Sequence, residues 1–219
     1  MAAPRPGKPR ETVLGVFVFM WFRPCFRASL LLLAGLWSCG PRQADPFDRV
    51  LDLQGNRVDP LARNGSGGTQ IAVFLFMAGE CPISNRYAPE IQRIARSFQD
   101  RPVRFWSVYP DPDEAPETIA GHQKEFGYSF GVLRDTGHQL VERCRARVTP
   151  EAAVFVLGAD GAATLFYHGR IDDRYADFGL ARAEAVEHDL ERAIQAALAG
   201  QPAPQLATTA IGCFIPRLP

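Results

Sequence analysis

An uninterrupted run of hydrophobic residues extends from Ile71 to Met77, and its length and its branched and aromatic content predict a central strand buried on both faces. A second apolar stretch, Val103 to Tyr109, predicts another strand, which the Pro- and Asp-rich turn at 110–113 ends. Between the two strands, apolar side chains recur at helical spacing. They predict one helix from about Pro82 to Phe98, through the positions Ile83, Tyr87, Ile91, Ile94 and Phe98.

The same patterns divide the rest of the chain into short strands and helices. The Asp160-Gly161 pair between two apolar stretches is a strong hairpin signal, and Gly200 ends the last amphipathic segment. The remaining predicted elements are a strand and turn at 50–56, a helix at 116–126, a strand at 128–133, a helix at 137–145, a hairpin of 152–157 with 163–168, and a helix at 181–199. No internal repeat interrupts this β-α-β-α-β-α-β-β-α order, which describes one layered α/β domain.

The N-terminal residues have the three parts of a secretory signal. From Met20 the chain has basic residues, then an apolar core of about ten residues from Ala28 to Trp37, then the small residues at 38–40. This core is too short to span a bilayer as a stable helix. The segment that ends at Cys39 also resembles the lipobox of bacterial lipoproteins, in which the cysteine is lipidated and becomes the mature N-terminus. Ordinary secretion is the alternative.

We expect translation to begin at Met20, because residues 1–19 add a second basic and apolar stretch that a signal does not need. A long basic leader or a signal anchor is the alternative. The expected organisation is a signal peptide at 1–39, a folded domain at 40–200, and a Pro-rich linker with a cysteine-containing tail at 201–219. The folded domain would then be extracytoplasmic, either periplasmic or anchored to the membrane as a lipoprotein through Cys39.

The charge distribution changes once the signal is set aside. The 219 residues carry 24 basic and 24 acidic side chains, and 47% are hydrophobic, which excludes disorder and binding of nucleic acid through bulk positive charge. The first 38 residues hold five of the basic groups and one acidic group, so the remaining chain has 19 basic and 23 acidic residues, a net charge of about −4. No nucleic-acid partner is expected.

Three of the five cysteines lie in the expected mature chain, because Cys25 and Cys39 belong to the signal. Cys81 precedes Pro82 at the point where the buried strand gives way to the helix. Proline is favoured at the first helical position, so Cys81 is expected at the helix N-terminus, where unpaired N–H groups and the helix dipole favour a thiolate. A thiolate is nucleophilic, and Cys81 is therefore the leading catalytic candidate.

Four motifs occur in an order that is typical of one fold family. They are the apolar strand leading into Cys81-Pro82-Ile83-Ser84, the segment Leu133-Arg134-Asp135, Val148-Thr149-Pro150-Glu151-Ala152 before a strand, and the turn Asp160-Gly161. Together they resemble the redoxin, or AhpC/TSA-like, branch of the thioredoxin-like superfamily, which also contains peroxiredoxins and extracytoplasmic thiol–disulfide oxidoreductases. The resemblance covers about Pro46 to Ala199 and implies an α/β, thioredoxin-like fold, with a central mixed β-sheet flanked by helices.

The resemblance also implies a structural role for Pro150. In such folds the matching proline follows a cis peptide bond and lies across from the active-site cysteine, so Thr149 and Pro150 would line the site. Without the resemblance, Thr-Pro is equally well explained as an ordinary pair at the start of a strand.

Two departures limit what the resemblance implies about the reaction. Thioredoxins have Cys-X-X-Cys, whereas Ser84 stands at the second cysteine position, so Cys81 has no resolving partner three residues away. Peroxiredoxins have Pro-X-X-X-Thr/Ser-X-X-Cys, and Phe74 and Ala78 occupy the proline and hydroxyl positions here. Neither standard mechanism is fully present in the sequence.

A polar segment after the hairpin, Arg170 to Tyr175, falls where thioredoxin-like folds approach the active-site cysteine. We expect Arg170 to support the Cys81 thiolate electrostatically and Asp172 to orient that arginine or to carry a proton. The alternative is a solvated loop that caps the next helix. Arg86, in the first turns of the helix after Cys81, either reaches the site or is an ordinary surface residue.

A sulfenic acid or a mixed disulfide at Cys81 needs a second thiol to resolve it. Cys144 falls on the apolar stripe of its helix with Leu140 and Val141, so we expect it to pack in the core. Cys213 lies in an apolar stretch beyond the Pro-rich linker, from which we infer that the tail docks and that Cys213 pairs with Cys81. A static disulfide with Cys144 and an unpaired thiol are the competing hypotheses.

No cofactor or metal is expected. Three histidines lack the spacing of metal ligands and are expected at the surface or in helix caps; they are His122, His138 and His168. The sequence therefore favours an extracytoplasmic thiol–disulfide oxidoreductase with a Cys81 thiolate. Its partners would be a protein disulfide and an external thiol reductant. The alternatives are a thiol peroxidase that reduces hydroperoxides and a non-catalytic protein for binding or metal delivery.

Overall fold

The structure is a computed structural model that describes residues 47–65 and 68–218. The expected signal peptide, its lipobox at Cys39 and the start at Met20 lie outside the described residues and stay predictions. Within the described ranges, no helix is both long and apolar enough to cross a membrane.

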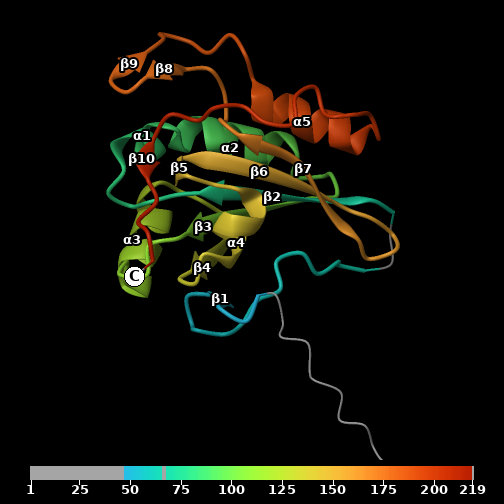
Figure 1. Ribbon diagram of the computed structural model, residues 1–219, viewed down its shortest axis with the longest axis horizontal. Coiled ribbons are helices and arrows are strands. Elements are labelled where there is room, and N and C mark those ends of the chain that lie inside the picture. The colour runs from blue at the N-terminus through green and yellow to red at the C-terminus, as the bar shows by residue number, and fades with distance from the viewer. Residues whose placement is uncertain (1–46, 66–67, 219) are drawn as a thin grey trace, which may run out of the picture. The chain divides into compact units, whose positions relative to one another are not determined.

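A six-stranded mixed sheet runs through the centre of the described domain (Figure 1). Its strands are β1 (Val50–Leu51), β2 (Gln70–Phe76), β3 (Val103–Tyr109), β4 (Gly131–Asp135), β6 (Glu151–Leu157) and β7 (Ala163–Gly169). They stand in the order β1-β4-β3-β2-β6-β7, in which β2, β3 and β4 are parallel and the other three pairings are antiparallel. This arrangement confirms the α/β, thioredoxin-like fold expected from the sequence.

Helices cover both faces of this sheet. They are α1 (Pro82–Arg86), α2 (Ala88–Ser97), α3 (Pro116–Glu125), α4 (Gln139–Cys144) and α5 (Asp189–Leu198). Helices α2 and α5 lie on one face and α4 lies on the other, while α3 connects the parallel strands β3 and β4 (Figure 1).

Strand β2 is buried on both faces, as its apolar run predicts. Val73 joins the core cluster that contains Ile91 of α2. Phe74 joins the cluster on the opposite face, which contains Leu140 of α4. Cys144 belongs to this second cluster and is 0% exposed, which confirms its expected position in the core.

The helix predicted at 82–98 is two helices, α1 and α2, that meet at Tyr87. Tyr87 ends α1, and its N–H bonds to the Ser84 carbonyl oxygen in a tightened last turn (3.1 Å). Pro89, in the first turn of α2, has no N–H to donate to the Asn85 carbonyl, so a continuous helix would lack that hydrogen bond. The apolar periodicity continues through the break, which is why it predicted a single helix.

The helix predicted at 181–199 begins only at Asp189. The residues before it include a small hairpin of β8 (Tyr175–Asp177) and β9 (Leu180–Ala181). The chain then stays irregular up to α5, because the Asp173 carboxylate accepts hydrogen bonds from the backbone N–H groups of Val186 and Glu187 (2.7 and 2.9 Å). These bonds use groups that a longer helix would need for its own turns.

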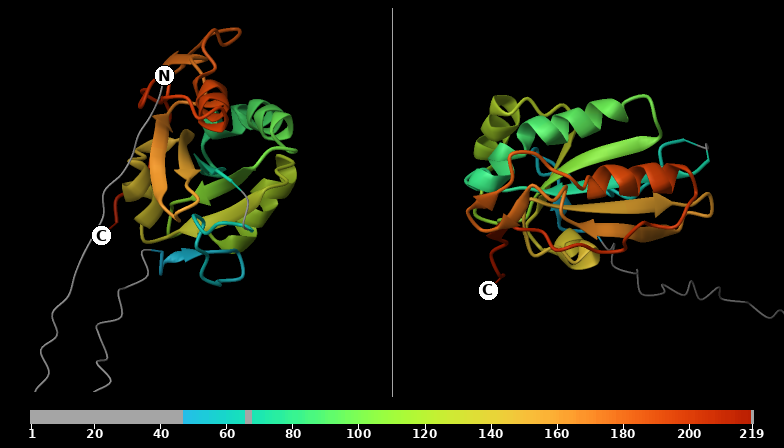
Figure 2. Two further views of the ribbon diagram at one scale, coloured as in Figure 1. Left: turned by 90° about the vertical axis from the view of Figure 1, so that its right-hand side faces the viewer. Right: turned by 90° about the horizontal axis from the view of Figure 1, so that it is seen from above.

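The C-terminal tail returns along the domain and pairs with two parts of it (Figure 2). Strand β10 (Cys213–Phe214) is antiparallel to β5 (Val148–Thr149). Upstream in the tail, the backbone of residues 206–208 exchanges two hydrogen bonds with the backbone of His168 at the end of β7 (both 3.1 Å). The docking of the tail that the sequence predicts is therefore present in the structure.

The carboxylate of Asp135, at the end of β4, fixes the start of α4. It is 0% exposed and accepts hydrogen bonds from the backbone N–H groups of Gln139, Leu140 and Val141, at 2.8, 2.9 and 2.8 Å. These donors have no partner inside the helix, so the carboxylate satisfies them and ties α4 to the sheet.

Replacing Asp135 by alanine should lower the free energy of unfolding by about 2 to 3 kcal/mol, since three buried helix N–H groups lose their acceptor. Urea unfolding followed by circular dichroism measures the change. The matched control is Asp160→Ala, because the Asp160 carboxylate accepts a bond from the Ala162 N–H in an exposed turn (3.0 Å). The control should cost less than about 1 kcal/mol. Equal losses in the two variants would contradict the capping role.

Candidate active site

Cys81 stands where β2 gives way to α1. It is the N-cap residue of α1, with extended backbone angles (φ −81°, ψ 110°), and Pro82 follows in the first helical turn. Its sulfur accepts a hydrogen bond from the Ser84 N–H (3.5 Å), as expected for a helix N-terminus. The residue is only 3% exposed. Cys81 is therefore a buried thiol next to a backbone N–H donor.

Three polar side chains hold the loop before Cys81. Glu114 accepts a hydrogen bond from the Gly79 N–H (3.1 Å), and the Asn85 amide donates to the Gly79 carbonyl oxygen (3.0 Å). The Asn85 carbonyl oxygen in turn bonds to Nε2 of His122 (2.8 Å). Both backbone groups of Gly79 are thus bonded, and the approach of the chain to Cys81 is fixed.

The prediction that His122 lies at the surface or in a helix cap is wrong. The side chain is 6% exposed, and its Nδ1 bonds to the hydroxyl of Tyr109 (2.6 Å). Burial lowers the pKa of His122, which favours the neutral ring, with Nε2 donating to Asn85 and Nδ1 accepting from the Tyr109 hydroxyl. No local motif connects His122 or Glu114 to Cys81, because α3 and the segment before it approach Cys81 only in the folded chain.

Thr149 and Pro150 lie across from Cys81, as the resemblance implies. The peptide bond between them is cis. The Thr149 carbonyl oxygen is 3.1 Å from Cys81 Sγ and accepts a hydrogen bond from the protonated thiol. This contact places the end of β5 beside the sulfur.

The docked tail brings Cys213 to Cys81. Their Sγ atoms are 2.7 Å apart, longer than the roughly 2.05 Å of an S–S bond, and both thiols are free. Cys213 stands opposite Thr149 in the β10–β5 pair, and a Cβ on Gly212 would overlap the Thr149 carbonyl group. The structure thus brings into contact the two cysteines that were predicted to pair, Cys81 and Cys213. Cys144 forms no disulfide with Cys213.

The two thiols in contact differ in acidity. Burial raises the pKa of the Cys81 thiol, but hydrogen bonds from the Cys213 thiol and from the Ser84 N–H outweigh it, and the pKa lies below its ordinary value. Burial, the hydrogen bond to Cys81 and the charge on Cys81 raise the pKa of Cys213 to about 11. Cys81 therefore ionises first, while Cys213 keeps its proton and donates it to the Cys81 thiolate.

Thr208 anchors the tail upstream of Cys213. Its Oγ1 accepts a hydrogen bond from the Arg170 N–H (3.0 Å) and bonds to the Tyr167 hydroxyl (2.7 Å). Gly169 has a positive φ of 139°, and a Cβ there would overlap the backbone of Thr208. The tail is thus attached at two places, with Cys213 at the second.

The structure does not bring Arg170 or Asp172 to the candidate nucleophile. The Arg170 guanidinium bonds to the Asp189 carboxylate at the start of α5 (2.7 Å). Asp172 accepts a hydrogen bond from the Tyr87 hydroxyl (2.5 Å), and Arg86 is exposed. Arg170 and Asp172 each have a nearer partner than the Cys81 sulfur, so neither supports the thiolate directly.

One group of side chains in the described ranges has the spacing of a metal site. Glu90, His188 and Glu191 place ligand atoms within 4.8 Å of one another. Arg93 bonds to both carboxylates, at 2.7 Å to Glu90 Oε1. The carboxylates of Glu90 and Glu191 are already bonded to the arginine, and we explain the group as a surface ion-pair network.

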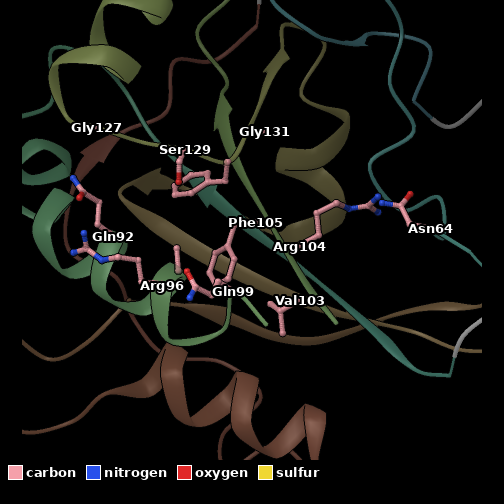
Figure 3. A pocket seen from close by; sticks show the side chains of 12 residues that line it. Asn64, Gln92, Arg96, Gln99, Val103, Arg104, Phe105, Gly127, Ser129 and Gly131 are labelled. Atoms are coloured by element: carbon pink, nitrogen blue, oxygen red, sulfur yellow. The ribbon is translucent and has the colours of Figure 1, made fainter. Parts of the chain in front are cut away.

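A hollow of about 400 Å³ lies between α2 and the first residues of β3 and β4 (Figure 3). Its lining includes Gln92, Arg96, Gln99 and Phe105. None of its lining residues is a cysteine, a histidine or a carboxylate, so it holds no thiol and no side chain that could activate the Ser129 hydroxyl as a base. Cys81, and not this hollow, is therefore the candidate reaction site.

Sequence comparison places the chain in a family. The AhpC/TSA family profile matches residues 45–164, which is more than half of the chain. The chain belongs to the AhpC/TSA family. The matched region includes Cys81 and the Thr149–Pro150 bond, and it ends before the tail that carries Cys213. No curated protein matches the sequence significantly.

Solved structures show the same fold for this AhpC/TSA-family protein. An uncharacterized conserved protein from Geobacillus kaustophilus is 24% identical over 78% of this chain and 88% of its own, with a TM-score of 0.63. A hypothetical protein from Sinorhizobium meliloti 1021 is 21% identical over 76% of this chain and 88% of its own, with a TM-score of 0.58. At these identities the likeness concerns the fold alone.

Replacing Cys213 by alanine should raise the pKa of Cys81 in this AhpC/TSA-family protein, because the thiolate loses its thiol donor. Alkylation of Cys81 by iodoacetamide, followed by mass spectrometry across a pH series, should therefore have its midpoint at higher pH in the variant than in the wild type. Cys144→Ala, on the opposite face of the sheet, is the control and should leave the midpoint in place. A midpoint that falls or stays unchanged in Cys213→Ala would show that Cys213 does not stabilise the thiolate.

Thr208→Val should loosen the tail and expose the buried Cys81 more often. The loss of the Thr208 side-chain hydrogen bonds costs about 1.4 kcal/mol, which corresponds to roughly tenfold faster labelling of Cys81 by a bulky maleimide. Thr209→Val is the matched control, since Thr209 is the exposed neighbour. Equal labelling rates in the two variants would show that Thr208 does not hold the tail.

Proposed function

We propose that the protein is an extracytoplasmic thiol–disulfide oxidoreductase in which Cys81 attacks a substrate disulfide and Cys213 resolves the product. The observation that carries this proposal is the 2.7 Å contact between the two sulfurs, beside the cis Thr149–Pro150 bond. Membership in the AhpC/TSA family supports thiol-based redox chemistry. Two thiols in contact store two electrons, which they release when one S–S bond forms.

In the first step the Cys81 thiolate attacks one sulfur of the substrate disulfide. A Cys81–substrate bond forms, the substrate S–S bond breaks, and the second substrate sulfur leaves as a thiolate that takes a proton from water. The Ser84 N–H, 3.5 Å from the Cys81 sulfur, supports the attacking anion.

In the second step Cys213 loses its proton and attacks the Cys81 sulfur. The Cys81–Cys213 bond forms, the mixed disulfide breaks, and the reduced substrate leaves and is protonated. In the resting dithiol the negative charge on Cys81 is one of the causes that hold the pKa of Cys213 at about 11. The mixed disulfide carries no such charge, so Cys213 releases its proton more readily at the step that requires it.

The tail has to move when the substrate is a protein disulfide. Cys81 is 3% exposed, and β10 pairs with β5 beside it, so a bulky substrate reaches the sulfur only after β10 has left β5. Strand β10 has only two residues, and few backbone hydrogen bonds need to break. An external thiol reductant then restores the dithiol.

We place this chemistry outside the cytoplasm, in the periplasm or at a membrane to which a lipidated Cys39 tethers the protein. The support is the basic and apolar N-terminal segment, which has the parts of a secretory signal. In an oxidising compartment, a dithiol such as Cys81 and Cys213 works only together with a dedicated source of electrons.

A thiol peroxidase is the second candidate, and one observation favours it. The Ser84 hydroxyl is buried in the first turn of α1 and has no hydrogen-bond partner among the described residues. A buried donor in the turn that follows Cys81 suits a hydroperoxide oxygen. In this reaction the Cys81 thiolate would take one peroxide oxygen as a sulfenic acid, while the O–O bond breaks and the other oxygen leaves as water or an alcohol. Condensation of the sulfenic acid with the Cys213 thiol would then give the same disulfide and one water.

The two candidates are separated by single-turnover reactions of pre-reduced protein with a cyclic disulfide peptide or with hydrogen peroxide. The wild type should reduce one equivalent of the peptide and end with a Cys81–Cys213 disulfide, and Cys213→Ser should accumulate the mixed disulfide. Cys81→Ser should be slower by at least about a hundredfold. Mass spectrometry identifies each product.

Cys144→Ala is the control for these reactions and should behave as the wild type. Peroxide consumption that is faster than peptide reduction, and that Ser84→Ala removes, would favour the peroxidase. Full activity of Cys81→Ser with both substrates would overturn both candidates.

A further inference from the structure

A second hollow, of about 580 Å³, opens over the tail and not over Cys81. Residues 177–178, at the turn between β8 and β9, form one wall, and the tail forms another. The residues that line it include Cys213 and the large apolar side chains of Val148, Phe178, Ile211 and Phe214. We call this hollow the Cys213 groove.

We propose that the Cys213 groove binds a polypeptide dithiol with apolar flanking residues, and that this partner reduces the Cys81–Cys213 disulfide by attacking Cys213. The proposal rests on the proposed function, because it assumes that this disulfide forms.

The two sulfurs differ in access. Cys81 is 3% exposed beneath the tail, whereas Cys213 is partly exposed and lines the groove. A thiolate has to reach the sulfur that it attacks, so the docked tail leaves Cys213 open and Cys81 blocked. Cys81 is then the leaving group, and it is the sulfur whose anion the N-terminus of α1 stabilises.

The thiol–disulfide exchange with the partner takes two steps. The partner's first thiolate bonds to Cys213, the Cys81–Cys213 bond breaks, and Cys81 leaves as a thiolate. The partner's second thiolate then attacks the partner's own first sulfur, and Cys213 leaves and takes a proton from water. The partner ends as a disulfide, and the protein regains two thiols.

The chemistry of the groove favours an apolar polypeptide over a small anionic thiol. Phe178 is 71% exposed and Phe214 is 87% exposed, and both gain from being covered. Asp177 is the one charged residue among those that line the groove. An anionic thiol such as glutathione would cover neither ring and would meet a charge of its own sign.

Strand β10 also offers backbone groups to an extended partner. The Ile215 N–H bonds to the Arg147 carbonyl oxygen (3.0 Å), so the alternation of an antiparallel pair leaves Phe214 opposite Val148 as a non-hydrogen-bonded pair. The backbone N–H and C=O of Phe214 therefore point away from β5. An incoming extended segment can bond to them, as in strand addition.

The groove depends on the redox state. The tail contributes Ile211, Cys213 and Phe214, so the groove exists only while the tail is docked. A Cys81–Cys213 bond fixes the tail in place covalently, whereas in the dithiol only non-covalent contacts hold it. The groove is present in the dithiol described here, and the Cys81–Cys213 bond would hold it in place in the oxidised form, which is the form that a reductant has to recognise.

Two synthetic peptides test the docking. Both contain the core Cys-Gly-Pro-Cys at equal net charge, one with Val and Ile flanks and one with Ser flanks. The apolar peptide should reduce the pre-oxidised protein at least about tenfold faster, and Phe178→Ser and Phe214→Ser should each remove most of this difference. Val186→Ser is the matched control, since Val186 is also 71% exposed but does not line the groove. Equal rates of the two peptides on the wild type, or an equal loss in the control, would overturn the proposal.

The apolar peptide with its second cysteine changed to serine tests the site of attack, because its reaction stops at the mixed disulfide. Peptide mapping should find this bond on Cys213 at least about tenfold more often than on Cys81. A bond mainly to Cys81 would refute the proposal. Dithiothreitol, which needs no docking, distinguishes failure of the proposed function from failure of the docking proposal. If oxidation of the protein forms no Cys81–Cys213 disulfide, the proposed function fails. If the disulfide forms and dithiothreitol reduces it at the same rate in all variants, then differences between the peptides report on docking alone.

Discussion

The close approach of two backbones at Gly212 is the constraint on which the site depends. A side chain at this position would overlap the Thr149 carbonyl group, and β10 could then not pair with β5. Without that pairing Cys213 would not lie 2.7 Å from Cys81. The attachment at Thr208 shortens the flexible stretch that has to be ordered before the sulfurs meet. A tail held at two points loses its conformational entropy when the domain folds. Bringing the two thiols together then requires little further loss of entropy.

The same docking sets the acid–base behaviour of both thiols. Burial disfavours the anion of either sulfur, and the hydrogen bond between them allows one charge to be shared by a donor and an acceptor. Cys81 becomes the acceptor because Ser84 supplies a second donor to it, from the first turn of α1. Among the described residues no such donor bonds to Cys213. The asymmetry between nucleophile and resolving thiol therefore comes from the hydrogen-bond donors that reach Cys81, which include the Ser84 N–H at a helix end.

Prediction from the sequence is correct where the cause of a structure is local. The apolar run at 71–77 is β2, and Cys81 stands at a helix N-terminus because Pro82 follows it. It failed where distant groups decide: the late start of α5 depends on the Asp173 carboxylate, and the burial of His122 depends on the packing of α3. The contact of Cys81 with the tail was an inference from the docking of an apolar segment, since no spacing rule covers so long a separation. Loop supports such as Glu114 left no signal at all.

Moving the second thiol from the helix to the tail changes what limits the proposed cycle. In Cys-X-X-Cys both sulfurs belong to one helical turn, so the resolving thiol is present in every conformation that binds substrate. Here Ser84 occupies that place, and Cys213 comes from a segment outside the family-matched residues 45–164. The segment that supplies the resolving sulfur also covers Cys81, so a bulky substrate and Cys213 compete for the same space. Substrate entry requires the tail to leave and product release requires it to return, and turnover would then follow the rate of this motion more closely than the reactivity of either thiol.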